Sequence, residues 1–261
     1  MTTPLSSPTS PVGVTGGGSG IGREVSRALA EVGRPIAAWD LNETGATETA
    51  AQCAGLGVKA FARAVDVRDN EAIASAIAAT LDALGSIGGL VHAAGVPMGP
   101  HEPLSAEEFD FVLSVNLRAE AVLANALLPS LREAGPGSAI VGISSIEGLI
   151  GHGNIPAYTA SKHGLIGLTR SLAARLGREG IRVNAVCPGY IATPMFLPVV
   201  AGEGARAAFE RKIPIGRLGE PQEIARLVRF LMSDDASYVH GSALVADGGV
   251  TAVGGQEYTP L

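Results

Sequence analysis

Short apolar segments alternate with longer helical segments along this chain, and this alternation limits the fold more than any other feature of the sequence. The apolar segments are mostly continuous runs, which is typical of strands covered on both faces. Such strands, separated by helices, predict a single doubly wound parallel α/β sheet of about seven strands with helices on both faces. The predicted strands are residues 12–15, 35–40, 58–65, 89–92, 138–143, 182–187 and 243–246. The predicted helices are residues 20–32, 43–54, 70–84, 106–131, 157–178 and 221–232.

The alternation runs without a linker or an internal repeat from residue 12 onward. We therefore expect one Rossmann-type domain over residues 12–261. Residues 1–11 are rich in Thr, Ser and Pro and are expected to form a flexible tail. The long irregular segment 189–214 is typical of a functional lid. Asp69 and Ser105 each precede a predicted helix and are expected to be its N-cap.

A glycine-rich segment, Thr15-Gly-Gly-Gly-Ser-Gly-Ile-Gly22, joins the first predicted strand to the first predicted helix. Glycines let the backbone turn tightly and approach a phosphate closely, and a helix N-terminus attracts an anion. The spacing differs from the strict Gly-x-Gly-x-x-Gly fingerprint. Its place between a strand and a helix still indicates a nucleotide site, and the predicted contacts are Gly16, Ser19, Gly20, Ile21 and Gly22.

Asp40 ends the second predicted strand, where a carboxylate can accept both ribose hydroxyls of an adenine nucleotide. A carboxylate there also repels a 2′-phosphate. No Lys or Arg follows Asp40, and Ser19 rather than a basic residue precedes Gly20. The sequence therefore predicts NAD as the cofactor, with NADP less favoured.

Tyr158 and Lys162 lie one helical turn apart and follow Ser145 in the sequence. Residues at positions i and i+4 share a helix face, so the Lys162 ammonium is expected to lower the Tyr158 pKa from its ordinary value near 10. A nearby serine hydroxyl can hold a carbonyl or alcohol oxygen. The three side chains together predict a proton-transfer site for alcohol–ketone chemistry.

These motifs, in this order and spacing, resemble those of the short-chain dehydrogenase/reductase family from about Val12 to Gly249. The resemblance implies an NAD-dependent oxidoreductase that interconverts a secondary alcohol and a ketone by hydride transfer. An NADPH-dependent reductase of ketones or 3-oxoacyl thioesters is the alternative, and a non-catalytic NAD-sensing protein is a second one. The resemblance rests on the glycine segment, Asp66-Val67, Ala94-Gly95, Asn116, Ser145, Tyr158-x-x-x-Lys162, Pro188-Gly189 and Asp247-Gly248-Gly249.

The resemblance also implies a role for each matching residue. Tyr158 is expected to be the general acid/base, Lys162 to bind the nicotinamide ribose, and Ser145 to hold the substrate oxygen. Asn116 is expected to support a water for proton relay, or alternatively to bond backbone groups near its helix. Further cofactor contacts are implied at Asp66, Val67, Ala93, Ala94, Gly95, Tyr158, Lys162, Pro188, Gly189, Ile191 and Thr193.

The chain departs from the family pattern at three places. The family usually has Asn-Asn-Ala-Gly where this chain has His92-Ala-Ala-Gly95, and we expect His92 to be a packed core histidine. Gly13 lies inside the first strand and Pro11 precedes it, which should weaken that strand. Gly88 stands where the family commonly has an aspartate.

The substrate pocket is expected to be mostly apolar, with one acidic residue. Glu147 lies two residues after Ser145 and is expected either to contact a polar or cationic substrate group or to face solvent. Cyclic diketones, hydroxysteroids, sugar alcohols and 3-hydroxyacyl compounds all fit such a pocket. The other predicted lining residues are Val96, Met98, His152, Tyr190, Met195 and Phe196.

Composition weighs against several other classes of function. The net charge of −6 weighs against a nucleic-acid binder, and no apolar run approaches the roughly 18 residues of a membrane span. Cys53 and Cys187 lack metal-site spacing and are expected to be free thiols, which favours a cytoplasmic protein without a metal. The resemblance implies a homotetramer with the long helices 106–131 and 157–178 at its interfaces.

Overall fold

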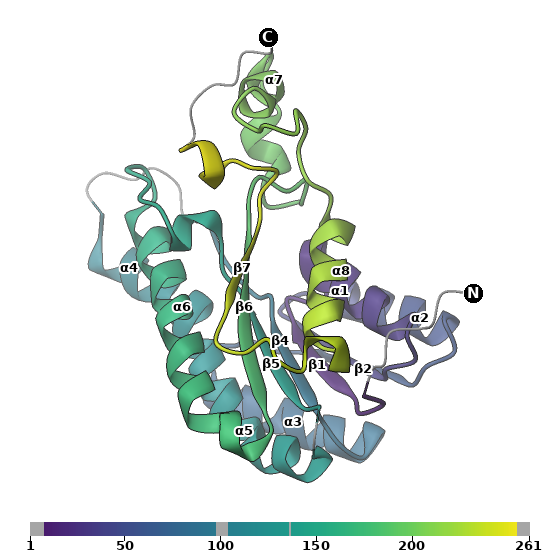
Figure 1. Cartoon of the computed structure of the whole chain (residues 1–261). Coiled ribbons are helices and arrows are strands. Elements are labelled where there is room, and N and C mark those ends of the chain that lie inside the picture. Colours follow the sequence, from purple (N-terminus) through teal and green to yellow (C-terminus); the bar gives the residue numbers. More distant parts are fainter. Residues whose placement is uncertain (1–7, 98–103, 136, 255–261) are drawn as a thin grey trace.

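A seven-stranded parallel sheet forms the centre of the molecule (Figure 1). The computed structural model describes residues 8–97, 104–135 and 137–254. The strand order is β3-β2-β1-β4-β5-β6-β7, so the order reverses between β1 and β4. The predicted doubly wound parallel sheet is therefore confirmed. The strands are β1 (Val12–Thr15), β2 (Ile36–Asp40), β3 (Ala60–Ala64), β4 (Gly89–His92), β5 (Ala139–Ile143), β6 (Arg182–Pro188) and β7 (Ala243–Ala246).

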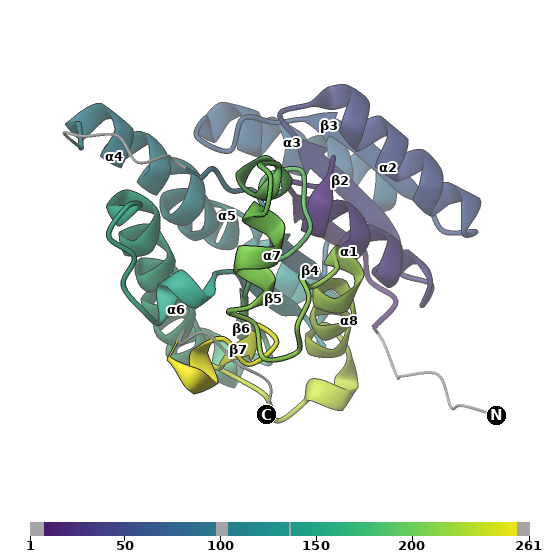
Figure 2. The ribbon, with the colours of Figure 1, turned by 90° about the horizontal axis from the view of Figure 1, so that it is seen from above.

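Helices cover both faces of this sheet, as the view from above shows (Figure 2). Helices α1, α2 and α8 share one apolar core with the strands, and α3, α5 and α6 share another on the opposite face. Burial on both faces explains why the strand sequences are continuously apolar. The helices are α1 (Gly20–Ala30), α2 (Glu43–Gly55), α3 (Asn70–Leu84), α4 (Ala106–Leu113), α5 (Ala119–Ala134), α6 (Pro156–Leu176), α7 (Ala205–Glu210) and α8 (Pro221–Leu231).

The two predicted N-caps are present. The Asp69 carboxylate accepts the backbone N–H groups of Glu71 and Ala72 at the start of α3. The Ser105 hydroxyl accepts the backbone N–H of Glu108 at the start of α4. These bonds satisfy backbone donors that have no partner inside the helix, and the predictions are confirmed.

The predicted helix over residues 106–131 is wrong in one respect, because it is not a single α-helix. A π-helical turn over Ser114–Arg118 separates α4 from α5. Such a turn inserts an extra residue and changes the direction of the side chains beyond it. Periodicity in the sequence does not reveal this turn, since the apolar residues on either side continue to face the core.

The irregular segment that we predicted over residues 189–214 contains two short helical pieces. A 3₁₀ turn over Leu197–Val200 and helix α7 lie within it. Figure 1 shows α7 above the sheet, beyond the end at which β6 leaves it. The segment therefore has a packed structure of its own over the end of the sheet where the carboxyl ends of the strands meet.

Part of the predicted N-terminal tail is fixed to the body of the protein. The guanidinium of Arg34 donates to the carbonyl and the hydroxyl of Ser10, and the backbone N–H of Gly88 donates to the Pro11 carbonyl. A side chain at Gly88 would overlap Ser10, which gives a reason for glycine at that position. Residues 1–7 of the predicted tail lie outside the described residues.

The combined helical stretch Ala106–Ala134 is long and apolar enough to cross a membrane by length and composition alone. Half of its most apolar 18-residue window is buried inside the fold, so we interpret it as a core helix. The large apolar residues of the two long helices that we expected at subunit interfaces are also mostly core. Val112, Val115, Leu123, Leu127, Leu165 and Leu176 are buried within this chain, and Leu168 and Leu172 are half-buried.

β1 is paired on both sides at Gly13, and a neighbouring side chain occupies the space of the missing Cβ. A Cβ at Gly13 would lie 2.7 Å from the ring of Trp39, which is itself buried on β2. The indole N–H of Trp39 donates to the Thr80 hydroxyl on α3, and this bond fixes the ring in place. Glycine here permits the indole to pack across β1.

We predict that Gly13→Ala destabilises the protein by about 1–3 kcal/mol, because the added methyl group overpacks a rigid aromatic contact. The free energy of unfolding should be measured by urea denaturation. Gly55→Ala is the matched control, since a Cβ at Gly55 meets nothing within 4 Å. An equal effect of the two substitutions would contradict this account of Gly13.

Candidate active site

The glycine segment forms a tight turn at the carboxyl end of β1. A Cβ at Gly16 would lie 2.7 Å from the backbone of Ala93, and one at Gly22 would lie 2.1 Å from the carbonyl oxygen of Gly16. Gly16 and Gly20 have φ angles of 64° and 51°, which favour glycine. Ser19 and Ile21 lie in the same turn. The turn packs against the loop after β4 and presents the N-terminus of α1, as a dinucleotide phosphate requires.

Asp40 is held beside this turn by two backbone bonds. Its carboxylate accepts the N–H groups of Gly18 and Asn42, both at 2.8 Å. A Cβ at Gly18 would lie 2.8 Å from the same carboxylate, so only glycine allows this approach. Each carboxylate oxygen keeps a further lone pair, so Asp40 retains the capacity to accept ribose hydroxyls.

Arg23 is a cation near Asp40 that the sequence pattern did not indicate. The Arg23 guanidinium donates to the Gly18 carbonyl at 2.6 Å, and it pairs with Glu48 at 2.9 Å. Arg23 is on α1 and Glu48 is on α2, so only the packing of these helices brings them together. Glu48 offsets part of the Arg23 charge at this end of the site.

The other predicted cofactor residues lie in loops at the same end of the sheet. Asp66 pairs with Arg68, which lowers the Asp66 pKa, and Val67 is buried. A Cβ at Gly20 would lie 3.6 Å from Thr193, so the loop after β6 faces the glycine turn. Ala93, Ala94, Gly95, Pro188, Gly189 and Ile191 occupy the loops and strand ends that complete this edge.

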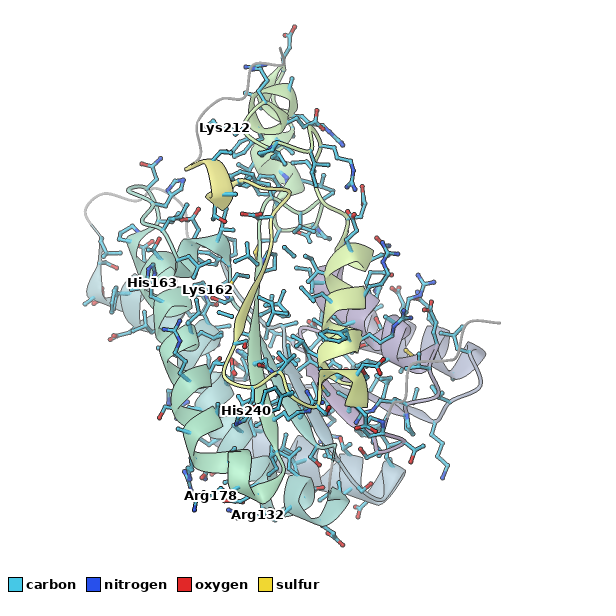
Figure 3. All side chains as sticks on the ribbon, in the orientation of Figure 1. Arg132, Lys162, His163, Arg178, Lys212 and His240 are labelled. Carbon is cyan, nitrogen blue, oxygen red and sulfur yellow. The ribbon has the colours of Figure 1, made fainter. Side chains whose placement is uncertain are left out.

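Lys162 is buried on the inner face of α6. Its ammonium donates to the backbone carbonyl of Ile143 at 2.8 Å, which is its only hydrogen bond within the described part of the chain. Figure 3 shows Lys162 toward the end of the sheet at which α7 lies, whereas Arg132 and Arg178 lie at the opposite end. Burial lowers the Lys162 pKa to about 8, because the charged form loses solvation.

Tyr158 and Ser145 lie together, as predicted. The Ser145 side chain hydrogen-bonds Tyr158 and favours its phenolate, and the Lys162 ammonium lies 5.4 Å from the Tyr158 ring centroid. However, burial raises the Tyr158 pKa to about 12. Our expectation that Lys162 lowers this pKa is therefore wrong for the protein alone, because Lys162 is directed at Ile143 and burial has the larger effect.

Asn116 lies in the π-helical turn and holds the loop after β4. Its amide oxygen accepts the Val96 N–H at 2.9 Å, and its amide nitrogen donates to the Val96 carbonyl and to the Ser161 hydroxyl. Asn116 is fully buried. Of our two expectations for this residue, the bonds to backbone groups are present in the structure.

Glu147 faces the site rather than solvent. Its side chain is 6% exposed, and its Oε2 atom is buried without a hydrogen-bond partner in the described structure. Burial raises the Glu147 pKa, while nearby His152 and His163 lower it. The Glu147 charge in turn raises the pKa values of Tyr158 and Tyr190. Glu147 therefore lies close to the predicted acid/base residue.

The predicted pocket residues divide into two groups. Tyr190 and Phe196 stack with ring centroids 5.5 Å apart, and both contact Phe209 of α7. Val96 is half-buried beside Asn116. Met195 and His152 are exposed, so the structure does not enclose them in a pocket. Met98 lies outside the described residues.

His92 is a core histidine, as predicted. Its Nε2 must donate to the Val115 carbonyl at 3.1 Å, because a carbonyl can only accept, and its Nδ1 then accepts from the Thr15 hydroxyl at 2.9 Å. This neutral ring joins β1, β4 and the π-helical turn. Burial, with a smaller effect of Lys162, lowers the His92 pKa to about 3.

A parallel sheet with a glycine turn at its switch point and a Ser–Tyr–Lys group beside it is the architecture of a dinucleotide-dependent oxidoreductase. The chain matches the family model described as Enoyl-(Acyl carrier protein) reductase over residues 16–251. It is 39% identical over 241 residues to cyclohexanol dehydrogenase of Acinetobacter sp. (strain SE19), covering 92% of this chain and 94% of that protein. The chain belongs to the short-chain dehydrogenase/reductase family.

Two further comparisons agree with this family assignment. The chain is 40% identical over 244 residues to cis-4-hydroxycyclohexanecarboxylate dehydrogenase of Sinomonas cyclohexanicum, covering 92% of this chain and 96% of that protein. The crystal structure of levodione reductase superposes with a TM-score of 0.88 at 36% identity, covering 94% of this chain and 98% of that one. The chain is thus an oxidoreductase of a family that uses NAD or NADP.

The buried neutral His92 predicts acid sensitivity. In the unfolded chain a histidine takes up a proton near pH 6.5, whereas folded His92 resists protonation down to about pH 3. Its contribution to stability is therefore present above pH 6.5 and falls by about 1.4 kcal/mol per pH unit between these values. Urea denaturation at pH 7, 5.5 and 4.5 should show His92→Asn losing less stability with acid than the wild type. His152→Asn, which changes an exposed histidine, is the control, and parallel pH curves for wild type and His92→Asn would refute the assignment.

Proposed function

We propose that this protein is an NAD-dependent dehydrogenase that interconverts a cyclic secondary alcohol and its ketone, with Tyr158 as the acid/base. The observation that carries the proposal is the contact of the Ser145 and Tyr158 side chains beside buried Lys162 at the carboxyl ends of β5 and β6. The hydroxyl groups of Ser145 and Tyr158 are available to hold one substrate oxygen between them. Tyr158 then takes the proton from that oxygen in oxidation and returns it in reduction.

The residues around the glycine turn suit NAD. Gly16, Ser19, Gly20, Ile21 and Gly22 would hold the diphosphate, and Asp40 would accept the ribose hydroxyls. Asp40 disfavours a 2′-phosphate because two negative charges would meet. When bound, NAD⁺ supplies the hydride acceptor and a positive charge that favours the Tyr158 phenolate. Lys162 would bind the nicotinamide ribose, and Asp66, Val67, Ile191 and Thr193 would complete the contacts.

Two observations support a substrate class: the names of the relatives and the aromatic residues among the predicted lining. The names cyclohexanol dehydrogenase and cis-4-hydroxycyclohexanecarboxylate dehydrogenase describe alcohols on a six-membered ring. Tyr190 and Phe196 offer apolar faces of a size that suits such a ring. We propose that Glu147 adds selectivity, because its buried Oε2 has no partner among the described residues and would accept a hydrogen bond from a second hydroxyl on the substrate.

We also propose a homotetramer in the cytoplasm. The outer faces of α5 and α6 carry small exposed residues such as Ala126 and Gly167, which allow close helix packing between subunits. The free cysteines Cys53 and Cys187 fit a reducing compartment. Analytical ultracentrifugation would test the oligomeric state.

We predict that Tyr158→Phe lowers the turnover number by about 10²- to 10⁴-fold, because the variant lacks the proton-transferring hydroxyl. Cofactor reduction should be followed with NAD⁺ and, separately, NADP⁺ against cyclohexanol and steroid, sugar and hydroxyacyl alcohols. Calorimetry should show that the variant still binds NAD. Normal turnover of Tyr158→Phe would sink the acid/base assignment, and a strong preference for NADP⁺ would overturn the role of Asp40.

We predict that Glu147→Gln reverses a substrate preference. The wild type should favour cyclohexane-1,4-diol over 4-hydroxycyclohexanecarboxylate, because a carboxylate repels Glu147. The substitution should lower kcat/KM for the diol by about tenfold and raise it for the carboxylate. Glu133→Gln, at an exposed position on α5, is the control. Unchanged preference in Glu147→Gln would show that Glu147 does not contact the substrate.

A further inference from the structure

Glu120 is a buried acid that neither the sequence analysis nor the proposed mechanism uses. It is the second residue of α5, directly after the π-helical turn that carries Asn116. Its side chain is fully buried, and within the described structure neither carboxylate oxygen has a hydrogen-bond partner. An unpaired buried carboxylate loses the solvation that stabilises its charge, so its presence calls for a compensating charge.

The carboxylate of Glu120 lies against β5 beneath the proposed site. A Cβ on Gly142 would lie 2.5 Å from Oε2 and 2.8 Å from Oε1 of Glu120, and 2.8 Å from the Leu165 side chain of α6. Only glycine at position 142 leaves room for the acid. The next residue along β5 is Ile143, whose carbonyl holds the Lys162 ammonium. Glu120 and Lys162 therefore approach adjacent residues of one strand.

Few charged groups face Lys162 in this region. Its ammonium is influenced by Glu120 from α5, by the Cys187 thiol from β6 and by His92 from β4. His92 is neutral, and burial raises the pKa of the Cys187 thiol. For Glu120, Lys162 is the one charged group in the described structure with a resolved effect. Glu120 is thus the main source of negative charge for Lys162.

We propose that Glu120 is a positioning residue of this site, whose buried carboxylate keeps the Lys162 ammonium in its charged state. This inference rests on the function proposed above, because the Lys162 ammonium matters there as the group that would bind the nicotinamide ribose beside Tyr158. Burial raises the Glu120 pKa and lowers the Lys162 pKa, and the charge of each group opposes this shift in the other. The two opposite charges stabilise each other, so removal of the Glu120 carboxylate should lower the Lys162 pKa.

The test measures Lys162 directly. The chain contains three lysines, Lys59, Lys162 and Lys212, so ¹³C signals from the lysine side chains can be assigned with a Lys162→Arg variant. In Glu120→Gln, the titration midpoint of Lys162 should fall by about one pH unit, which is a tenfold smaller ratio of charged to neutral lysine at a given pH. The acid limb of kcat/KM for alcohol oxidation should move to higher pH, while the KM for NAD at the plateau stays unchanged.

Matched variants separate this role from a structural one. Glu120→Asp keeps the charge and should keep most of the wild-type Lys162 midpoint. Glu120→Ala also removes the charge and replaces Glu120→Gln if that variant fails to fold. Thr169→Val removes a fully buried hydroxyl on α6 that has no hydrogen-bond partner in the described part of the chain, and it should leave the Lys162 midpoint unchanged. An unchanged Lys162 midpoint in folded Glu120→Gln, or an equal shift in Thr169→Val, would overturn the proposal. The NMR readout does not depend on turnover, so failure of the proposed Tyr158 chemistry would be seen separately in Tyr158→Phe.

Discussion

The common direction of all seven strands is the constraint on which the rest of the structure depends. Parallel strands bring their carboxyl ends to one edge of the sheet, and the loops that follow them meet there. The glycine turn after β1, the loop after β4 and Ser145 after β5 are thereby neighbours in space although they are far apart in the sequence. A site that combines phosphate, ribose and substrate contacts needs this convergence.

The end of β5 also explains how a lysine is accommodated in the core. β4 ends opposite Gly142, so Ile143 has no ladder partner on that side of the sheet. Its carbonyl is free to accept the Lys162 ammonium, which would otherwise be buried without a bond. His92, Glu120 and Lys162 lie in the layer between the sheet and helices α5 and α6. These three buried titratable groups therefore lie in one layer beneath the proposed site.

The local sequence pattern was sufficient to predict some elements of the fold and site. Packing between segments that are distant in the sequence determines the others. The strands, the N-caps at Asp69 and Ser105 and the core position of His92 follow from neighbouring residues. Glu120 escaped notice because a glutamate on a helix normally faces solvent, and the π-helical turn before it has no sequence signal. The Trp39–Gly13 contact and the Arg23–Glu48 pair depend on the mutual placement of separate elements, which periodicity does not specify.

Two glutamates influence the Ser145–Tyr158–Lys162 group with opposite effects. Glu120 raises the Lys162 pKa, whereas Glu147 raises the Tyr158 pKa and so disfavours the phenolate. A substrate hydroxyl that donates to Glu147 would disperse its negative charge and weaken this opposing effect. Recognition of a second hydroxyl and activation of Tyr158 would then be coupled through one carboxylate. A substrate that has no second hydroxyl to donate to Glu147 leaves the full Glu147 charge beside Tyr158. The contact that selects the substrate would therefore also affect how readily Tyr158 takes the proton of the reacting hydroxyl.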